Sequence, residues 1–185
     1  MYKAIATVLT WLALIASPPA AGAAPVVSAG FATVQVGDVF TMQISISGAQ
    51  DLSAWQFDLA FDPAILQANF ITEGTFMSGF GQTLFVPGVV DNGSGTISLT
   101  ADSYVDFAPL PSGDGVLALI EFQALTEGIS ALALSNVFLD FGTAPAEVTQ
   151  GEIVVSGNGD VPEPATPAMV AVAAVALGWV RRQRP

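Results

Sequence analysis

Two neighbouring stretches of this chain, residues 39–47 and 52–61, alternate apolar and polar side chains. The apolar positions are Phe40, Met42, Ile44 and Ile46 in the first stretch, and Trp55, Phe57, Leu59 and Phe61 in the second. A period of two residues indicates a β-strand with one buried face. Each stretch therefore predicts a half-buried strand, and Trp55 is expected in the core because it is in phase with Phe57 and Phe61.

Eight more short stretches with strand-like composition are separated by Gly, Pro, Asn and Asp. They are residues 31–36, 65–71, 83–89, 96–102, 116–124, 129–135, 137–141 and 147–156. A helical period is absent apart from a single turn at 63–67, after Asp62-Pro63 ends the preceding strand. About nine strands joined by polar turns predict an all-β, two-sheet antiparallel sandwich of jelly-roll type, with a closed barrel as the alternative.

The first 23 residues have the pattern of a secretory signal peptide. Lys3 precedes an apolar stretch at 4–16, and Ala21-Gly22-Ala23 supplies small residues for a signal peptidase. We expect cleavage after Ala23, with an uncleaved N-terminal anchor as the alternative. The predicted domain is then residues 24–159.

The last 26 residues, 160–185, combine a short motif, an apolar run over 168–180 and a basic end. The motif is Pro162, Glu163 and Pro164, and the basic residues are Arg181, Arg182 and Arg184. As a helix the apolar run is about 20 Å long, shorter than a hydrocarbon layer of about 30 Å. The arginines favour a cytoplasmic end, so that the domain lies outside the inner membrane.

This tail resembles the PEP-CTERM sorting signal of Gram-negative bacteria that make exopolysaccharide. The resemblance implies that Pro162, Glu163 and Pro164 are recognised by an exosortase, a membrane-embedded cysteine transpeptidase. It implies that Arg181, Arg182 and Arg184 act as a topological stop during transient anchoring in the inner membrane. The final location is then the cell surface or the extracellular matrix. A plain C-terminal membrane anchor is the alternative reading of the tail.

The domain itself has a second resemblance. The string AWQFDLAFDPAILQ, preceded by GDVFTMQISISG and followed later by LALIEFQAL, is similar to strands of cohesin modules and related carbohydrate-binding sandwiches. In those families the aromatic strand with its Asp-Pro lies early in a nine-stranded jelly roll. The resemblance implies a fold, and it transfers no dockerin-binding residue to this chain.

Charge is distributed very unevenly. The four basic residues all lie in the predicted sorting segments, whereas 15 acidic residues lie between Asp38 and Asp160. The domain therefore contains no side-chain salt bridge, and nucleic-acid binding is excluded because it depends on Lys and Arg. The acids could attract Ca²⁺, but no calcium-loop motif accompanies them, so a solvated acidic surface is the alternative. We expect added salt or calcium to raise the melting temperature.

Most catalytic chemistry is excluded by composition. The chain has no His or Cys, and the domain has no Lys or Arg, which removes nucleophilic triads, thiolate and imidazole metal sites and Schiff bases. The glycine-rich segments 91–95 and 112–115 are expected to be hairpin turns, with Asn92-Gly93 providing positive φ angles. Asn92-Gly93-Ser94 also matches a glycosylation sequon.

Paired carboxylates are the remaining catalytic possibility. Asp58 with Asp62, or Asp102 with Asp106, could serve a glycoside hydrolase, but each also reads as a turn or surface residue. The domain is therefore expected not to be an enzyme and to need no cofactor.

Aromatic residues near loops are the candidates for ligand binding, because sugars stack on aromatic rings and interface energy concentrates there. The candidates are Phe80, Phe85, Tyr104 and Phe107. Residues 76–89 are expected to form an exposed functional loop or a buried edge hairpin. The sequence thus predicts an exported carbohydrate-binding matrix protein, with a protein-interaction module of the envelope as the alternative.

Overall fold

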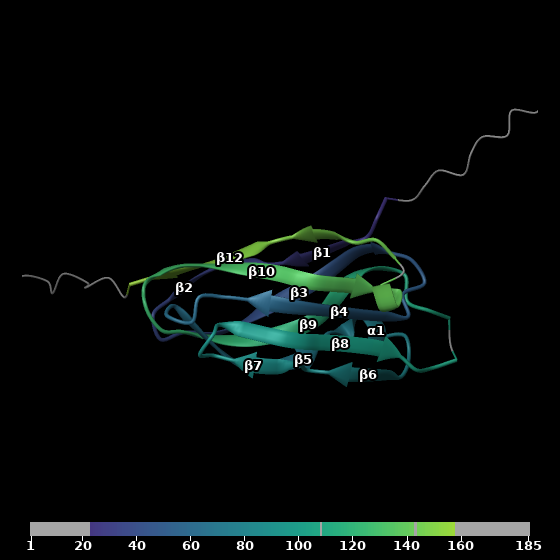
Figure 1. Cartoon of the computed structure of the whole chain (residues 1–185), viewed down its shortest axis with the longest axis horizontal. Coiled ribbons are helices and arrows are strands. Elements are labelled where there is room, and N and C mark those ends of the chain that lie inside the picture. Colours follow the sequence, from purple (N-terminus) through teal and green to yellow (C-terminus); the bar gives the residue numbers. More distant parts are fainter. Residues whose placement is uncertain (1–22, 108, 143, 158–185) are drawn as a thin grey trace, which may run out of the picture.

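The chain folds into two β-sheets packed face to face (Figure 1), as seen in a computed structural model that describes residues 23–107, 109–142 and 144–157. The predicted all-β sandwich is confirmed. The expected signal helix and the membrane helix over 168–180 lie outside the described residues. Within the described part, no helix is long and apolar enough to cross a membrane.

The two sheets contain twelve strands, and two helical elements complete the fold. In spatial order the five-stranded sheet is β11 (Glu147–Thr149), β1 (Val26–Ala29), β3 (Val39–Ala49), β9 (Gly113–Ala124) and β5 (Leu66–Glu73). The seven-stranded sheet is β2 (Phe31–Gln35), β12 (Gly151–Ser156), β10 (Gly128–Leu139), β4 (Ala54–Ala60), β8 (Thr96–Tyr104) and β6 (Thr83–Val86), with β7 (Val89–Asp91) also paired to β8. The helical elements are α1 (Thr75–Ser78) and the 3-10 turn η1 (Asp140–Gly142).

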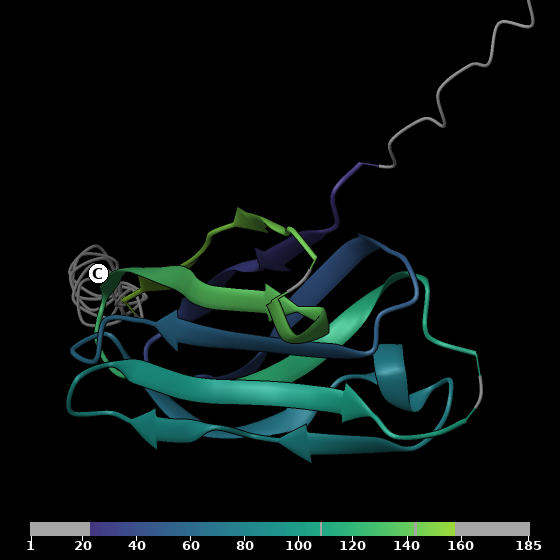
Figure 2. The ribbon, with the colours of Figure 1, turned by 45° about the vertical axis from the view of Figure 1, so that its right-hand side comes forward.

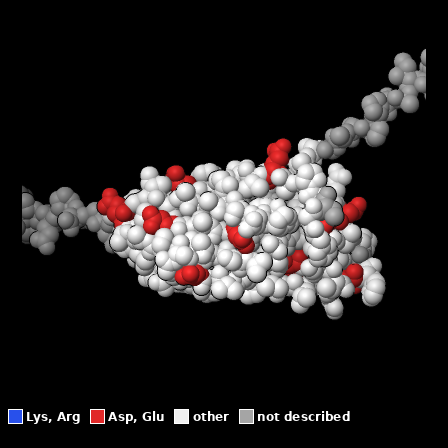
Figure 3. Space-filling model, viewed as in Figure 1, with Lys and Arg blue, Asp and Glu red and all other residues white. Residues whose placement is uncertain are grey.

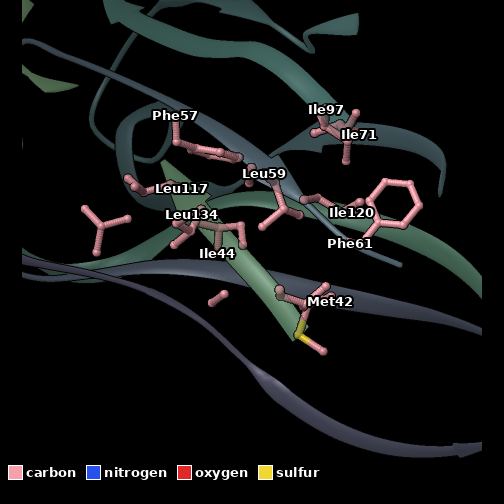
Figure 4. Close-up of a cluster of buried hydrophobic side chains, with 14 of the residues drawn as sticks. Met42, Ile44, Phe57, Leu59, Phe61, Ile71, Ile97, Leu117, Ile120 and Leu134 are labelled. Carbon is pink, nitrogen blue, oxygen red and sulfur yellow. The ribbon is translucent and has the colours of Figure 1, made fainter. Parts of the chain in front are cut away.

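The core lies between the sheets and follows the predicted alternation. Three of the predicted inward residues of β3 are buried and Phe40 packs against the core, while all four of the second stretch, including Trp55, are buried. Figure 4 shows Met42 and Ile44 of β3 together with Phe57, Leu59 and Phe61 in this core. Each buried Leu, Ile or Phe contributes about 1.5–3 kcal/mol. Every buried hydrophobic residue of the described chain lies between Val27 and Val155, so residues 24–157 contain a complete core.

The first and last strands of the domain change sheets side by side. β1 pairs with β11 and β2 with β12, both in parallel, so the chain passes from one sheet to the other at Gly30 and again at Gln150. A Cβ on Gly151 would lie 2.3 Å from the carbonyl oxygen of Gly30, so only glycine fits this crossing. The single strand predicted at 147–156 is therefore divided, and the sandwich is not purely antiparallel.

Other strand boundaries also differ from the sequence prediction. The predicted strands 129–135 and 137–141 are one strand, β10, with a bulge after Ser135. The predicted strand 83–89 is interrupted at Pro87 and Gly88, which separate β6 from β7 along the same edge of β8. Both changes arise because a bulge or a proline alters pairing without interrupting the apolar pattern.

The two glycine-rich turns were only partly predicted. Residues 91–95 do join β7 to β8, but the positive φ belongs to Gly95, and Asp91 accepts the backbone N–H groups of Gly93 and Ser94. The segment 112–115 is not a hairpin turn, because β9 already begins at Gly113.

Chain entry and exit lie at opposite ends of the sandwich. Figures 1 and 2 show residue 23 leaving at the end that carries α1, η1 and the loop 105–112, and Gly157 leaving at the other end. The segment that leads to the tail therefore starts far from the α1 end.

Candidate functional site

The outer faces of the two sheets differ in polarity. The outer face of the five-stranded sheet carries mainly polar side chains, among them Thr41, Gln43, Asn69, Glu121 and Gln123. The outer face of the seven-stranded sheet instead exposes Leu84, Val86, Leu99, Phe138 and Phe141. An exposed apolar area of this kind marks a binding surface.

Strand register places these apolar residues next to small ones. Val86 pairs with Ala101, Ala101 with Gln56, and Gln56 with Phe138, so one row crosses four strands from β6 to β10. Ala101 in this row and the neighbouring pair of Ala54 and Ser103 are small, whereas Val86 and Phe138 at the sides of the row are large. It therefore forms a depression rather than a flat sheet.

A hollow of about 550 Å³ occupies this depression. Its lining includes the small residues Ala54, Ala101 and Ser103 from β4 and β8, and the aromatic residues Phe138 and Phe141 from β10 and η1. The volume suits a side chain or short segment of a partner, because apolar pockets with a few polar groups are typical binding sites. Phe141 and Gly142 of η1 line the hollow. η1 is at the end of the sandwich opposite the exit of the chain at Gly157 (Figure 1).

Phe141 is held in an unusual backbone conformation. Asp140, Phe141 and Gly142 have φ values of 48°, 57° and 83°, a left-handed turn that non-glycine residues adopt at a cost. Asp140 Oδ1 accepts the N–H and the O–H of Ser53 at 2.7 and 2.8 Å, which fixes the turn against the start of β4. In this turn Phe141 is 80% exposed.

Charge on this face is negative and scattered. The seven-stranded sheet faces the viewer in Figure 1, and Figure 3 shows the same view with separate acidic groups on an uncharged surface. The described residues include no Lys or Arg. A partner with basic groups would therefore meet attraction and no like charge.

The four aromatic residues predicted as ligand-binding do not come together. Phe85 is turned inward onto Trp55, with ring centroids 6.2 Å apart, and the Tyr104 hydroxyl is buried. Phe80 and Phe107 are exposed and lie on neighbouring loops, which are joined by the bond from Val105 N to the Gln82 carbonyl oxygen at 3.0 Å. Residues 76–89, expected as an exposed loop or a buried edge hairpin, contain α1, with Phe76 and Met77 buried, and the edge strand β6.

The carboxylate pairs proposed from the sequence are also separated by the fold. Asp58 lies on the outer face of β4, where its oxygens accept Leu99 N and Asn136 Nδ2. Asp62 accepts the N–H of Ala64 in the turn after β4. Both residues therefore have structural partners that account for their positions in the turn and on the sheet.

The second pair differs more strongly from the prediction. Asp102, expected at the surface, is 1% exposed on the inner face of β8, and burial and then Glu73 raise its pKa to about 7. Asp106 is exposed and accepts the N–H groups of Phe107 and Gln82. The carboxylate that acts on Asp102 is thus Glu73 from the other sheet.

Two further sequence hypotheses concern metal and sugar attachment. Across residues 23–107, 109–142 and 144–157, no three carboxylates gather in a way that could hold a metal ion. The Asn92 side chain of the sequon is engaged with Ala68, accepting its N–H at 2.8 Å and donating to its carbonyl at 2.9 Å. Asn92 is therefore a structural residue in the folded domain.

Sequence reasoning missed the residues of the hollow. Phe138 and Phe141 were part of a predicted strand, and Ala54, Ala101 and Ser103 were unremarkable small residues on polar faces. The sequence does contain a signal, because the outward residues of β4 and β8 include small side chains. This signal can be used only when the strand order is known, since it depends on β4 and β8 being neighbours.

Comparisons with known proteins agree with this fold. A family model described as "Cohesin domain" matches residues 25–155, and one described as "PEP-CTERM protein-sorting motif" matches residues 160–184. A search of curated proteins finds no match.

Solved structures also resemble the chain. A non-cellulosomal cohesin of the archaeon Archaeoglobus fulgidus has a TM-score of 0.59 at 17% identity, over 72% of this chain and 92% of that one. The third ScaC cohesin of Acetivibrio cellulolyticus, solved with the ScaB dockerin, has 0.58 at 19% identity, over 71% and 98%. Coh-OlpC of Clostridium thermocellum, solved with Doc435, has 0.58 at 13% identity, over 72% and 94%.

Proposed function

Since this chain belongs to the cohesin domain family, we propose that it is an exported protein-interaction module whose partner docks on the outer face of the seven-stranded sheet. The hollow between Phe138 and Phe141 is the observation that carries the proposal. An exposed aromatic residue beside a pocket with a small-residue floor is the usual arrangement of an interface hot spot. The sandwich itself performs no catalysis in this proposal.

The chemistry of the face indicates the kind of partner. Its centre is apolar, its surroundings are acidic, and the described residues offer no cation. The partner would therefore present an apolar side chain to the hollow and Lys or Arg around it. Two of the structurally similar bacterial cohesins are solved in complex with dockerins. A dockerin-like protein of the envelope would fit the requirements of this face.

Sorting completes the proposal. The match of residues 160–184 to the PEP-CTERM motif supports export and delivery to the envelope. In this proposal an exosortase-type transpeptidase recognises Pro162, Glu163 and Pro164, and Arg181, Arg182 and Arg184 hold the tail in the inner membrane during processing. Because Gly157 is at the end opposite η1, a tail or anchor would leave the hollow free (Figure 1).

The test is a binding measurement with a matched control. Residues 24–157 are immobilised, a protein retained from the envelope of the producing organism is identified and purified, and its affinity is measured by calorimetry. We expect Phe141→Ala and Ala101→Trp each to weaken binding at least tenfold, the first by removing an anchor and the second by filling the hollow. Phe70→Ala is the control, because Phe70 is 51% exposed on the other sheet. Equal affinity in all variants would reject this face.

Carbohydrate binding is a second candidate, favoured by a single observation. Phe80 and Phe107 are exposed on loops that lie side by side at the α1 end. Exposed aromatic rings can stack on sugar rings, as they do on other flat ligands. Retention of residues 24–157 on the organism's exopolysaccharide, lost in Phe107→Ala and kept in Phe141→Ala, would support this function over protein docking.

A further inference from the structure

Three buried polar atoms have no hydrogen-bond partner within the described chain. They are Trp55 Nε1, Asp102 Oδ2 and Tyr104 Oη, and all three belong to the inner side of β4 and β8. Trp55 is directly opposite Asp102 in the strand register, and Tyr104 is two residues further along β8. Buried polar atoms are normally satisfied, so this corner of the sandwich requires an explanation.

Asp102 is the most costly of these groups. Phe85 on β6 lies opposite it on the other side, so the carboxyl group stands in a row between two aromatic residues. Asp102 Oδ1 accepts the N–H of Ser103 at 2.8 Å, but Oδ2 has no donor. An ionised carboxylate in such surroundings is strongly disfavoured unless a cation is close, and the described residues provide none.

Glu73 at the end of β5 approaches Asp102 from the opposite sheet. Its Oε1 accepts the hydroxyl of Thr83 at 2.7 Å, which keeps the carboxylate in place. Burial first, then the charge of Glu73, raises the pKa of Asp102 to about 7, so the neutral acid is strongly favoured at this position. Two facing carboxyl groups can hydrogen-bond to each other only when one of them carries a proton.

The other elements around Asp102 contribute no second charge of either sign. β4 contributes Trp55, β6 contributes Thr83 and Phe85, and α1 has no ionisable residue. On β8 itself Tyr104 faces the same side, and burial together with Asp106 raises its pKa, so its hydroxyl stays neutral. Glu73 is thus the charged group against which Asp102 titrates.

We propose that Asp102 and Glu73 share one proton and thereby form a clamp between the two sheets that loosens when the proton is lost above neutral pH. In the closed state the Asp102 O–H donates to the Glu73 carboxylate. In the open state the proton passes to solvent, and two facing carboxylates repel each other without a compensating cation. β5 and the β8–β6 edge are then pushed apart at the α1 end, in a way independent of any partner.

The pH dependence follows from the direction of the shift. The folded chain keeps a proton on Asp102 up to about pH 7, whereas the unfolded chain releases it near the ordinary pKa of 3.8. Stability from this proton is fully present below about pH 4 and is lost as the pH rises through about 7. The surface acids repel one another over part of the same range, so the measurement needs a variant that lacks only Asp102.

The experiment is thermal unfolding of residues 24–157 from pH 4 to pH 8, at constant ionic strength and with EDTA present so that divalent cations do not bridge the carboxylates. The Asn side chain of Asp102→Asn can donate to Glu73 at every pH. We expect this variant to melt at or below the wild-type temperature at pH 4–5 and several degrees above it at pH 8. Asp106→Asn, which removes an exposed acid nearby, should leave the wild-type pH profile unchanged in shape.

A difference in melting temperature between Asp102→Asn and wild type that stays constant with pH would overturn the clamp.

A ¹³C NMR titration of the wild-type side-chain carboxyl groups tests the clamp even if Asp102→Asn does not fold. It should show one group titrating near pH 7, and Glu73→Gln should move that titration to lower pH. Titration of every carboxyl group below about pH 5 would reject the shared proton.

Discussion

The carboxylate of Asp58 accepts the backbone N–H of Leu99 at 2.7 Å, at a bulge where Leu99 has a φ of 60°. The other oxygen of Asp58 accepts Nδ2 of Asn136 at 2.6 Å, at a bulge in β10 where φ is 48°. One side chain of the central strand β4 thus holds a bulge in each neighbouring strand. Both bulges re-aim outward side chains on the face that we propose for docking.

Replacing Asp58 should loosen both bulges. Asp58→Ala leaves the Leu99 N–H without its acceptor, and an unmade hydrogen bond of this kind costs about 1–3 kcal/mol. We expect a loss of that size in the free energy of unfolding, measured with urea. Glu127→Ala removes an acid whose carboxylate makes no hydrogen bond with the described residues, and should change stability by less than about 0.5 kcal/mol. Similar losses of unfolding free energy in the two variants would mean that the bulges are stable without Asp58.

The sequence predicted the layers of the fold better than its irregularities. Alternation in β3 and β4 identified the buried faces, because a period of two depends only on which side chains are apolar. The bulges at Leu99 and Asn136 and the crossing at Gly151 could not be predicted, since each depends on a neighbouring strand far away in the sequence. The same limit explains the candidate site, because the hollow combines residues from β4, β8, β10 and η1.

The expectation for Asp102 was wrong for a related reason, whereas Asp58 and Asp62 lie on the outer face and in the turn as expected. Asp102 follows the polar pattern of a surface strand end, yet the strand continues to Tyr104 and turns the carboxyl group inward. Its partner Glu73 is 29 residues away and on the other sheet. Sequence spacing favoured Asp106 as the partner, whereas the sandwich favours Glu73.

The crossing of the terminal strands should tolerate no side chain. In Gly151→Ala the new Cβ would lie 2.3 Å from the Gly30 carbonyl oxygen and 2.9 Å from the Ala29 carbonyl carbon, both backbone atoms that cannot move alone. We expect a loss of at least about 3 kcal/mol, at the upper end for overpacking. Gly93→Ala in the β7–β8 turn, whose nearest atom is the Asp91 side chain at 3.1 Å, is the control. A normal melting temperature for Gly151→Ala would show that the strands can separate there.

Asn92 should resist replacement by its acid. Asn92→Asp keeps the acceptor for the Ala68 N–H but places a carboxylate oxygen against the Ala68 carbonyl, where the amide now donates. We expect a loss of about 1–3 kcal/mol at pH 7, and a smaller loss at pH 4, where the acid can be protonated and donate again. Gln67→Glu adds the same charge on an exposed side chain one residue from Ala68. A pH-independent loss would contradict the donor role.

Phe141 should trade stability for binding. The left-handed backbone costs a non-glycine residue about 1–2 kcal/mol, and glycine removes this cost. Glycine also has greater freedom when unfolded, which offsets about 0.5–1 kcal/mol of that gain in stability. Because the ring is exposed, Phe141→Gly loses little burial and should be as stable as wild type or up to about 1 kcal/mol more stable, measured by urea unfolding. The same variant should bind the docking partner at least tenfold more weakly.

Leu99→Gly is the matched variant for Phe141→Gly. Leu99 has a similar φ and is also exposed, but it does not line the hollow. It should therefore gain stability in the same way, and it should lose less affinity for the partner than Phe141→Gly does, because it lies on the docking face but outside the hollow. If Phe141→Gly is instead destabilised by more than about 1 kcal/mol, the ring packs on the domain and the strained turn serves the fold. If it is stable and loses clearly more affinity than Leu99→Gly, the strain exists to present Phe141, because nothing in the domain itself requires that ring.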